Sequence, residues 1–413
     1  MTSPHLVITL LRSKPKLLAL FLFICALSFV IISFFHLSSS YYPYSLPDYN
    51  PLGELAESAS SEEPSHSKIP SVRPPLVPKP SPHNSNSDPY NNPNCTYLYP
   101  SSPLKFSTSR DVIFASLAIF KDKSRMSGHF AADTYRLLLS HSKSQMKARL
   151  VLFVDDRLNT DKELLSVFDE FSANLEIVWV KVEFPMVAYR FVFYLNYLKN
   201  MTDSIDRVML IDARDSLFLA DPFPFFPPNQ ITVNPQGCDG THGFHKSGWT
   251  PNWVDKFYGR QHGVSFRAKK LPVLNVGTIF GDCVQMVKFL KVMETQMEKS
   301  RAGFKRATFG LDQAALNYAF HLGFFDTVGV KVGLLIEKDS PIALYIRCNE
   351  GSVDGNGYYL NSNGCPLAML HGYDRSAKFL AQVVKDFPIP EGWSTSRAED
   401  NKIKVDSDGK VVS

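Results

Sequence analysis

The chain has 413 residues, a hydrophobic content of 44% and a formal net charge of +4 at pH 7. This composition can supply a substantial core, and the length allows one large domain or two smaller ones. The charge is nearly balanced, and no basic stripe with interleaved aromatic residues is present, which argues against a nucleic-acid-binding protein.

The N-terminal region predicts a membrane anchor. Arg12, Lys14 and Lys16 precede residues 17–37, an apolar run without Asp, Glu, Lys or Arg. At about 1.5 Å per residue, this run matches the hydrocarbon core of a bilayer, roughly 30 Å. A cleaved signal peptide is the alternative, but its apolar stretch is typically about 7–15 residues long and ends in small residues. We therefore expect residues 1–16 to be a cytoplasmic tail and the remainder to be luminal, as in a single-pass type II Golgi protein.

The segment after the anchor predicts a stem. Residues 38–109 are rich in Pro, Ser and Asn and poor in apolar residues. Such a segment buries too little surface to offset the cost of ordering, so we expect it to be disordered and to act as a spacer. A low-complexity insertion without a role is the alternative. Residues 110–390 then form the predicted luminal catalytic domain, and residues 391–413 form a polar C-terminal tail.

Sequons and cysteines fit a luminal domain. Asn94 and Asn200 each begin an N-x-T glycosylation triplet. Of the six cysteines, five lie outside the predicted anchor, and a lumen allows disulfides to form. An odd number leaves one cysteine free or paired between chains. Cys348 and Cys365 flank a loop rich in Gly and Asn and are the predicted pair, whereas no CxxC or HExxH motif indicates zinc.

Apolar runs and amphipathic segments alternate along the predicted domain. The expected strands are residues 111–120, 150–154, 176–180, 208–211, 271–281 and 342–346. The expected helices are residues 127–141, a helix opening at a Thr160–Glu163 capping box, and residues 187–198, 283–299 and 311–322. This alternation predicts an α/β fold with a mostly parallel central sheet. Residues 232–270 are less regular and predict long binding loops.

Two carboxylates follow one of the predicted buried strands. Residues 208–211 are apolar, and Asp212 and Asp215 come directly after them. In open α/β sheets, ligands bind beyond the carboxyl ends of the strands. Carboxylates at that position can hold a hard divalent cation, which shares oxygen ligands with substrate phosphates. A strand that ends in a solvated acidic turn is the alternative.

Four segments together resemble the GT-A nucleotide-sugar glycosyltransferases, especially glycosyltransferase families 8 and 77, over residues 111–379. They are LIDARDSLFLADPF at 210–223, LNVGTIFG at 274–281, LDQAALN at 311–317 and LHGYDRSAK at 370–378. The resemblance implies a Rossmann-like nucleotide-diphospho-sugar transferase fold. It also implies Mn²⁺ or Mg²⁺ as cofactor, a nucleotide-sugar donor such as a UDP-sugar, and retention of anomeric configuration.

The metal-binding motif departs from the family pattern. The family has D-x-D, whereas this chain has Asp212-Ala213-Arg214-Asp215. The resemblance implies Asp215 as main metal ligand and Asp212 as ribose or metal partner. It also implies His371 as third ligand, since neutral imidazole suits Mn²⁺, although a histidine after a strand can also be structural. Arg214 either pairs with an acidic neighbour or takes part in the chemistry.

Further residues fall on family positions near the reacting groups. Asp312 and Gln313 open a helix behind a glycine, and the resemblance implies that they are catalytic, near the acceptor or the anomeric carbon. The alternative for Asp312 is a charge that the helix dipole favours. The resemblance places Lys378 near the leaving diphosphate, and Arg375 is a competing candidate.

Five residues are predicted to bind the donor besides Asp212 and Lys378. Asn275 and Gly277 belong to the N-x-G strand, where either a sugar hydroxyl or a neighbouring backbone group would satisfy the buried asparagine. Arg190 lies on an apolar helix and either contacts phosphate or extends to solvent as a surface residue. Ala115 and Ser116, at the end of the first strand, are expected near the nucleotide base.

The acceptor is expected to be a glycan, glycoprotein or glycolipid. Trp249, Trp253 and Tyr258 could stack on its sugars, or could equally pack inside the protein. We therefore expect a type II membrane glycosyltransferase. The D-x-x-D spacing keeps open a non-catalytic luminal lectin or scaffold on a degenerate GT-A fold. A glycosidase, which also uses two carboxylates, is a further alternative, although it would need no metal.

Overall fold

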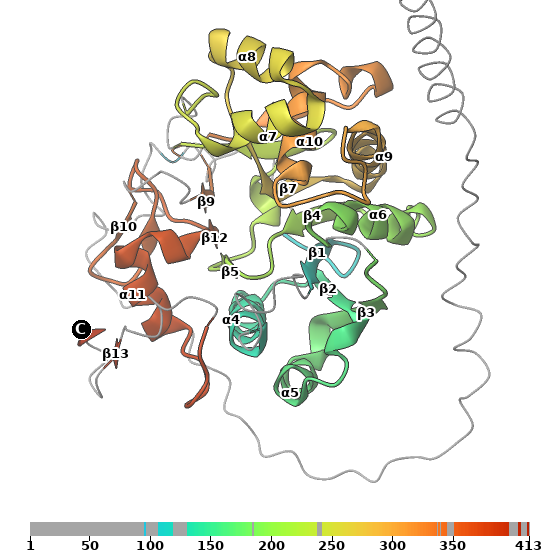
Figure 1. The fold of residues 1–413 in the computed structure, drawn as a ribbon. Coiled ribbons are helices and arrows are strands. Elements are labelled where there is room, and N and C mark those ends of the chain that lie inside the picture. Colours follow the sequence, from blue (N-terminus) through green and yellow to red (C-terminus); the bar gives the residue numbers. More distant parts are fainter. Residues whose placement is uncertain are drawn as a thin grey trace, which may run out of the picture. The chain divides into compact units, whose positions relative to one another are not determined.

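The apolar runs form one seven-stranded sheet in the computed structural model (Figure 1). Its strands are β1 (Val112–Leu117), β2 (Arg149–Asp155), β3 (Leu175–Val180), β4 (Arg207–Ile211), β6 (Ile231–Pro235), β7 (Leu274–Asp282) and β8 (Val332–Leu334). They lie in the order β3-β2-β1-β4-β7-β6-β8. Strands β3 to β4 are parallel, β7 is antiparallel to both of its neighbours, and β8 is parallel to β6. The prediction of a mixed α/β fold with a mostly parallel central sheet is confirmed.

The structure describes residues 95, 106–118, 130–183, 186–237, 242–336, 338, 340–344, 351–395, 404–405 and 411–412. The predicted cytoplasmic tail, the predicted anchor, most of the predicted stem, Asn94 and Cys348 lie outside these residues. Within the described part of the chain, no helix has the length and apolar character needed to cross a membrane.

Helices cover both faces of the sheet (Figure 1). They are α4 (Phe130–Lys143), α5 (Lys162–Glu170), α6 (Met186–Lys199), α7 (Trp249–Tyr258), α8 (Arg260–Ala268), α9 (Cys283–Lys299), α10 (Leu311–His321) and α11 (Ala377–Asp386). Short 3-10 helices join some of these elements: η3 (Asp156–Leu158), η4 (Ser172–Asn174), η5 (Phe223–Phe225), η6 (Asp326–Val328) and η8 (Tyr373–Arg375).

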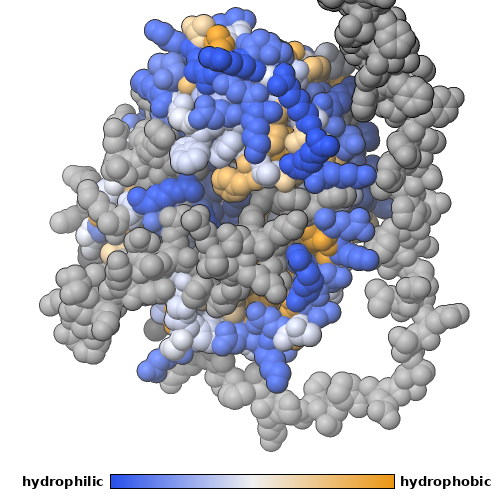
Figure 2. Space-filling model, viewed as in Figure 1, coloured by the Kyte–Doolittle hydropathy of each residue, from blue (hydrophilic) through white to orange (hydrophobic). Residues whose placement is uncertain are grey.

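The alternation of side chains along β1 divides the core into two layers. Val112 and Phe114 belong to an apolar cluster with residues of α6, α9 and α10. Ile113 and Ala115 point the other way, into a cluster with α4 and α5. Successive side chains of a strand face opposite sides of the sheet, so an all-apolar strand is expected where helices cover both faces. On the described surface in view in Figure 2, hydrophilic residues predominate, as expected when the apolar residues lie inside.

A second, smaller sheet brings the C-terminal part of the chain to the end of β4. It contains β5 (Ser216–Phe218), β12 (Met369–His371) and β9 (Ile342–Leu344), in that order. Strand β12 is antiparallel to β5, with His371 opposite Ser216, and parallel to β9. Two short antiparallel pairs complete the strands: β10 (Ser352–Val353) with β11 (Tyr359–Leu360), and β13 (Lys404–Val405) with β14 (Val411–Val412).

Two local predictions need correction. Residues 232–270 were expected to form long loops, but much of this range is regular, in β6, α7 and α8. Helix α7 buries Val254 and Phe257 three residues apart, a short apolar stripe that the neighbouring Gly, Pro and Trp residues obscure in the sequence. Helix α5 is capped by Asp161, whose side chain accepts a hydrogen bond from the Leu164 amide at 3.1 Å, and not by Thr160.

The predicted Cys348–Cys365 disulfide is wrong, because Cys365 is bonded to Cys95. The two cysteines are 270 residues apart, so no local spacing could indicate their pairing. Cys95 lies in the predicted stem, and Ser107 also contacts the domain, since its amide donates to the Asp221 carboxylate at 2.7 Å. The last part of the predicted stem is therefore attached to the folded domain.

We predict that Cys95→Ser lowers the free energy of unfolding by about 2–5 kcal/mol, the usual loss on removing a native disulfide. Denaturant unfolding of the oxidised wild type and the variant measures this difference. Under reducing conditions the two proteins should unfold alike. Peptide mapping without reductant should recover Cys95 linked to Cys365, and a Cys348–Cys365 peptide would contradict the assignment.

Candidate metal and ligand site

Asp212, Asp215 and His371 form a group that could hold a metal ion. Asp212 follows β4, Asp215 precedes β5, and His371 ends β12. One ligand atom from each lies within 4.8 Å of the others. His371 Nε2 is 3.4 Å from Asp212 Oδ2 and 3.6 Å from Asp215 Oδ1. The D-x-x-D spacing therefore keeps both carboxylates in one cluster.

Backbone hydrogen bonds to two sheets fix the turn that carries both aspartates. The Asp212 amide donates to the Gly277 carbonyl of β7 at 3.0 Å. The Gly372 amide, which directly follows β12, donates to the Asp215 carbonyl at 2.7 Å. The turn is thus attached to the central sheet at one end and to the small sheet at the other.

Neighbouring side chains orient the three potential ligands. Arg190 bonds to Asp212 Oδ1, and Arg214 Nη2 is 3.0 Å from Asp215 Oδ2, which leaves one oxygen of each carboxylate toward His371. On the far side of the imidazole, Nδ1 lies 3.3 Å from Thr278 Oγ1. A hydrogen bond at one ring nitrogen fixes the direction of the other, as is usual for histidine metal ligands. Two carboxylate oxygens and one imidazole nitrogen are a suitable donor set for a divalent cation.

Gly277 leaves the space that this group occupies. A Cβ atom at Gly277 would lie 2.2 Å from His371 Cε1 and 2.5 Å from Asp212 Oδ2. The Gly277 amide donates to Asn275 Oδ1 at 2.7 Å, so a backbone group satisfies the buried asparagine oxygen. Of the two predicted partners for Asn275, the structure therefore contains the neighbouring backbone.

Arg190 connects the metal group to helix α10. Its side chain is 8% exposed, with Nη1 bonded to Asp212 and Nη2 3.0 Å from Asp312 Oδ2. Arg190 was predicted either to contact phosphate or to extend to solvent. The structure contradicts the solvent-exposed alternative, because it buries Arg190 between two carboxylates that lie 22 and 122 residues along the chain.

The charges in this chain of contacts set the protonation states. Burial lowers the pKa of Arg190, but Asp212 and Asp312 outweigh it and keep the pKa above its ordinary value. Burial raises the pKa of Asp212, but Arg190 and His371 outweigh it and hold that pKa well below its usual range. For Asp312, burial outweighs the opposing effect of Arg190 and raises the pKa to about 6. Asp212 is thus an ionised ligand at neutral pH, whereas Asp312 can exchange a proton near neutrality.

A divalent cation would give the site a positive charge. Asp212, Asp215 and Asp312 are balanced in formal charge by the guanidinium groups of Arg190, Arg214 and Arg375. A bound dication would therefore leave a net positive charge. This arrangement would suit an anionic ligand such as a diphosphate, which hard cations commonly bind together with carboxylates.

Helix α10 places Asp312 toward Arg190 and uses the rest of its motif for packing. Asp312 is 2% exposed and accepts a hydrogen bond from the Gln313 amide at 2.8 Å. Gln313 Nε2 donates to Thr250 Oγ1 of α7 at 2.8 Å. Asn317 bonds to both the amide and the carbonyl of Leu274 in β7. Within this motif, Asp312 is the side chain that contacts the site.

The remaining predicted site residues lie at varying depth. Ala115 is fully buried, and its side chain packs in the core. Ser116 lies beside the hydroxyl of Tyr194, and Tyr194 follows Arg190 by one turn of α6. Burial raises the pKa of Tyr194 to about 12. Asn200 is exposed directly after α6, as its sequon requires.

Two basic candidates flank the small sheet. Arg375 Nη2 is 3.8 Å from Asp215 Oδ2, and the Arg375 side chain is about one-third exposed, so it borders the metal group. Lys378 lies in the first turn of α11, and its side chain is outside the described atoms.

Thr278 and the bridging role of Arg190 were missed by sequence reasoning. The only available signal for Thr278 was a hydroxyl next to the N-x-G motif.

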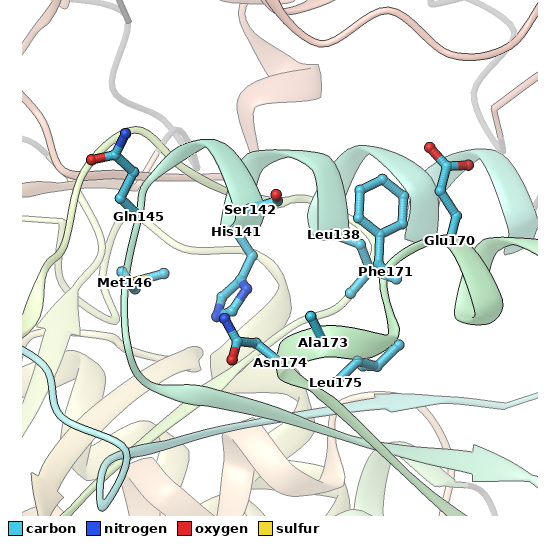
Figure 3. A pocket seen from close by; sticks show the side chains of 10 residues that line it. All are labelled: Leu138, His141, Ser142, Gln145, Met146, Glu170, Phe171, Ala173, Asn174 and Leu175. Atoms are coloured by element: carbon cyan, nitrogen blue, oxygen red, sulfur yellow. The ribbon is translucent and has the colours of Figure 1, made fainter. Parts of the chain in front are cut away.

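The pocket in Figure 3 is separate from this site. Its volume is about 290 Å³, and its lining includes His141 at the end of α4 and Leu175 at the start of β3. It therefore lies at the amino-terminal ends of β2 and β3, whereas Asp212 follows the carboxyl end of the parallel strand β4. Burial lowers the pKa of His141, and its ring contacts the Ala148 carbonyl, which is a structural role.

No protein-family model matches this chain, and a search of curated proteins also found no match.

We predict that Gly277→Ala abolishes high-affinity Mn²⁺ binding, because its Cβ would displace His371 or Asp212 from the cluster. Calorimetric titration with Mn²⁺ measures the affinity. Gly355→Ala is the matched control, since nothing lies within 4 Å of the added methyl group there. Wild-type Mn²⁺ affinity in Gly277→Ala would exclude this cluster as the metal site.

We also predict that Asp312 makes stability depend on pH. Its folded-state pKa of about 6 exceeds its ordinary value of 3.8, so the folded state binds this proton more tightly. The contribution is fully present below pH 4 and is lost as the pH rises through 6, by up to about 3 kcal/mol. Urea unfolding of the metal-free wild type and Asp312→Asn at several pH values measures it. Parallel curves for the two proteins would contradict the assignment.

Proposed function

We propose that this protein is a metal-dependent glycosyltransferase of the GT-A type. It would transfer a sugar from a nucleotide-sugar donor, most simply a UDP-sugar, to a glycan, glycoprotein or glycolipid. The observation that carries the proposal is the Asp212, Asp215 and His371 group, joined through Arg190 to Asp312. A nucleotide sugar has a diphosphate that needs charge neutralisation and a reacting carbon a short distance away. The metal group would meet the diphosphate, and Asp312 would meet the reacting carbon.

The topology supports a nucleotide site at this position. The strand order reverses between β1 and β4, which are parallel neighbours. In open α/β sheets, ligands bind at such a switch point, outside the carboxyl ends of the strands. Ser116 lies near the end of β1 and Asp212 directly after β4, so both border this crevice.

Asp212, Asp215 and His371 would hold Mn²⁺ or Mg²⁺. The carboxylates suit either ion, and the imidazole favours Mn²⁺. When bound, the ion would neutralise charge that develops on the departing nucleoside diphosphate. Arg375, at the edge of the cluster, and Lys378 are the basic residues that could contact the same phosphates.

Arg190 would act as a positioning residue in this scheme. It ties Asp212 beside the diphosphate to Asp312 beside the reacting carbon, so the two ends of the donor meet groups at a fixed separation. Holding reacting groups in such a geometry lowers the entropic part of the barrier. We propose retention of anomeric configuration, as in the families that the motifs resemble.

The predicted anchor, stem and sequons support a Golgi location for this proposed activity. Residues 17–37 would hold the chain in the membrane, and the stem would keep the catalytic domain in the lumen. This location supplies both nucleotide sugars and glycosylated acceptors to the same compartment.

Asp215→Asn is predicted to abolish transfer, because it removes one of the two anionic ligands of the metal. A screen of nucleotide-sugar hydrolysis with Mn²⁺ or with EDTA identifies the donor and measures this loss.

Asp312→Asn is expected to bind UDP and Mn²⁺ nearly as the wild type does while turnover falls about a hundredfold or more, the scale of losing a well-placed catalytic group.

Asp206→Asn is the matched control, because Asp206 pairs with Arg110 at the surface, where both side chains are about half exposed. Its turnover should equal that of the wild type. Turnover by Asp215→Asn, or a wild-type protein that neither binds UDP with Mn²⁺ nor hydrolyses any donor, would overturn the proposed function.

A further inference from the structure

Three aromatic side chains form a row beside helix α10. Trp249 and Trp253 lie one turn apart on α7, with ring centroids 6.4 Å apart, and Phe309 meets Trp253 edge-on at 5.4 Å. Trp249 is 67% exposed and Phe309 is 66% exposed, although burial normally stabilises such large apolar groups. We call these three residues the aromatic row.

The aromatic row is held firmly against the first turn of α10. Gly310, with φ of +92°, caps this helix, and a Cβ atom there would lie 2.3 Å from the Trp253 ring. The Gln313 side chain donates to Thr250, which is the neighbour of Trp249. Helix α7 is therefore packed against the turn that carries Asp312, with the Trp253 ring against Gly310.

Direct contacts connect the aromatic row to the metal group. Trp253 packs on Gly310, and Asp312 follows two residues later. Asp312 bonds to Arg190, and Arg190 bonds to Asp212. The aromatic row thus contacts the helix turn that carries Asp312, and Asp312 contacts the metal group through Arg190.

We propose that Trp249, Trp253 and Phe309 form the acceptor subsite, which binds a sugar ring of a glycan acceptor by stacking. This inference rests on the proposed function, because it assigns the group that receives the transferred sugar. The C–H face of a pyranose is apolar and flat, so it covers an exposed aromatic ring while its hydroxyls stay in water. Because the row packs on Gly310, two residues before Asp312, it would bring an acceptor hydroxyl toward the reacting end of the donor.

The surroundings of the row favour a sugar over a membrane or a protein partner. Lys256 and Thr308, joined by a 2.7 Å hydrogen bond, lie between the two aromatic segments in sequence and supply polar groups nearby. A stable protein interface buries about 800 Å² on each partner, far more than three side chains provide. A single sugar ring or a short glycan matches the smaller area.

The sequence left open whether Trp249, Trp253 and Tyr258 bind ligand or pack internally. Tyr258 is buried and stacks on Tyr318 with centroids 3.9 Å apart, so it belongs to the core. Gln313, predicted as catalytic, becomes a positioning residue that fixes α7 through Thr250.

The first test measures sugar binding without donor or metal. An array of immobilised oligosaccharides is probed with the wild type and with a Trp249→Ala/Phe309→Ala double variant. The wild type should bind a subset of glycans, and the variant should bind them at least about tenfold more weakly. Trp179→Ala and Phe106→Ala are matched controls, because Trp179 and Phe106 are exposed aromatic residues on other segments. Binding that is absent from the wild type, or unchanged in the double variant, would overturn the subsite.

The second test separates this inference from the proposed function. UDP and Mn²⁺ affinity and donor hydrolysis by water should be unchanged in the double variant, while the KM for a glycan identified on the array rises at least about tenfold. Sugar binding that depends on the row, in a protein that binds no UDP, would uphold the subsite and reject the transferase. Donor hydrolysis together with an unchanged acceptor KM would uphold the transferase and reject the subsite.

Discussion

The buried guanidinium of Arg190 is the group on which the geometry of the site depends. A charge removed from water is costly unless it is paired with good geometry, and removing one partner of a buried pair strongly destabilises a protein. Arg190 meets this requirement with carboxylates from two different elements, Asp212 after β4 and Asp312 in α10. The relative positions of α6, the end of β4 and the first turn of α10 therefore follow from one electrostatic constraint. The same guanidinium group thereby holds the Asp212 and Asp312 carboxylates close to each other.

Crowding at the end of β4 explains why the surrounding residues are small or polar. Strands β4 and β7 are adjacent and antiparallel, and Gly277 of β7 lies directly against the two ligands. With no side chain at Gly277, His371 can approach Asp212 from the small sheet. Thr278, the next residue, then receives the other imidazole nitrogen. Two sheets can thus contribute ligands to one cluster only because β7 supplies a glycine at the point where they meet.

Local patterns were enough to predict most strands and most helices, and the family resemblance supplied the three potential metal ligands. Helix α9 has the predicted limits, because an uninterrupted amphipathic pattern fills Cys283–Lys299. The partners of Arg190 could not be predicted, since they depend on how α6 and α10 pack on the sheet, which sequence spacing does not contain. The Cys95–Cys365 bond joins residues 270 apart and is hidden for the same reason. Sequence reasoning brought His371 to the two aspartates across a long separation, but it missed the contacts of Arg190 and the disulfide partner of Cys365.

The additional residue of the D-x-x-D motif packs into the apolar core. Ala213 is 4% exposed and joins the apolar cluster that contains β1 and α4 residues, so its methyl group turns away from the metal group. Arg214 then lies against Asp215, and Asp215 can reach His371. A methyl group fits this buried position, whereas a larger side chain would need space that a close-packed core does not contain. The altered spacing is therefore compatible with a working metal site because its extra residue is small and apolar.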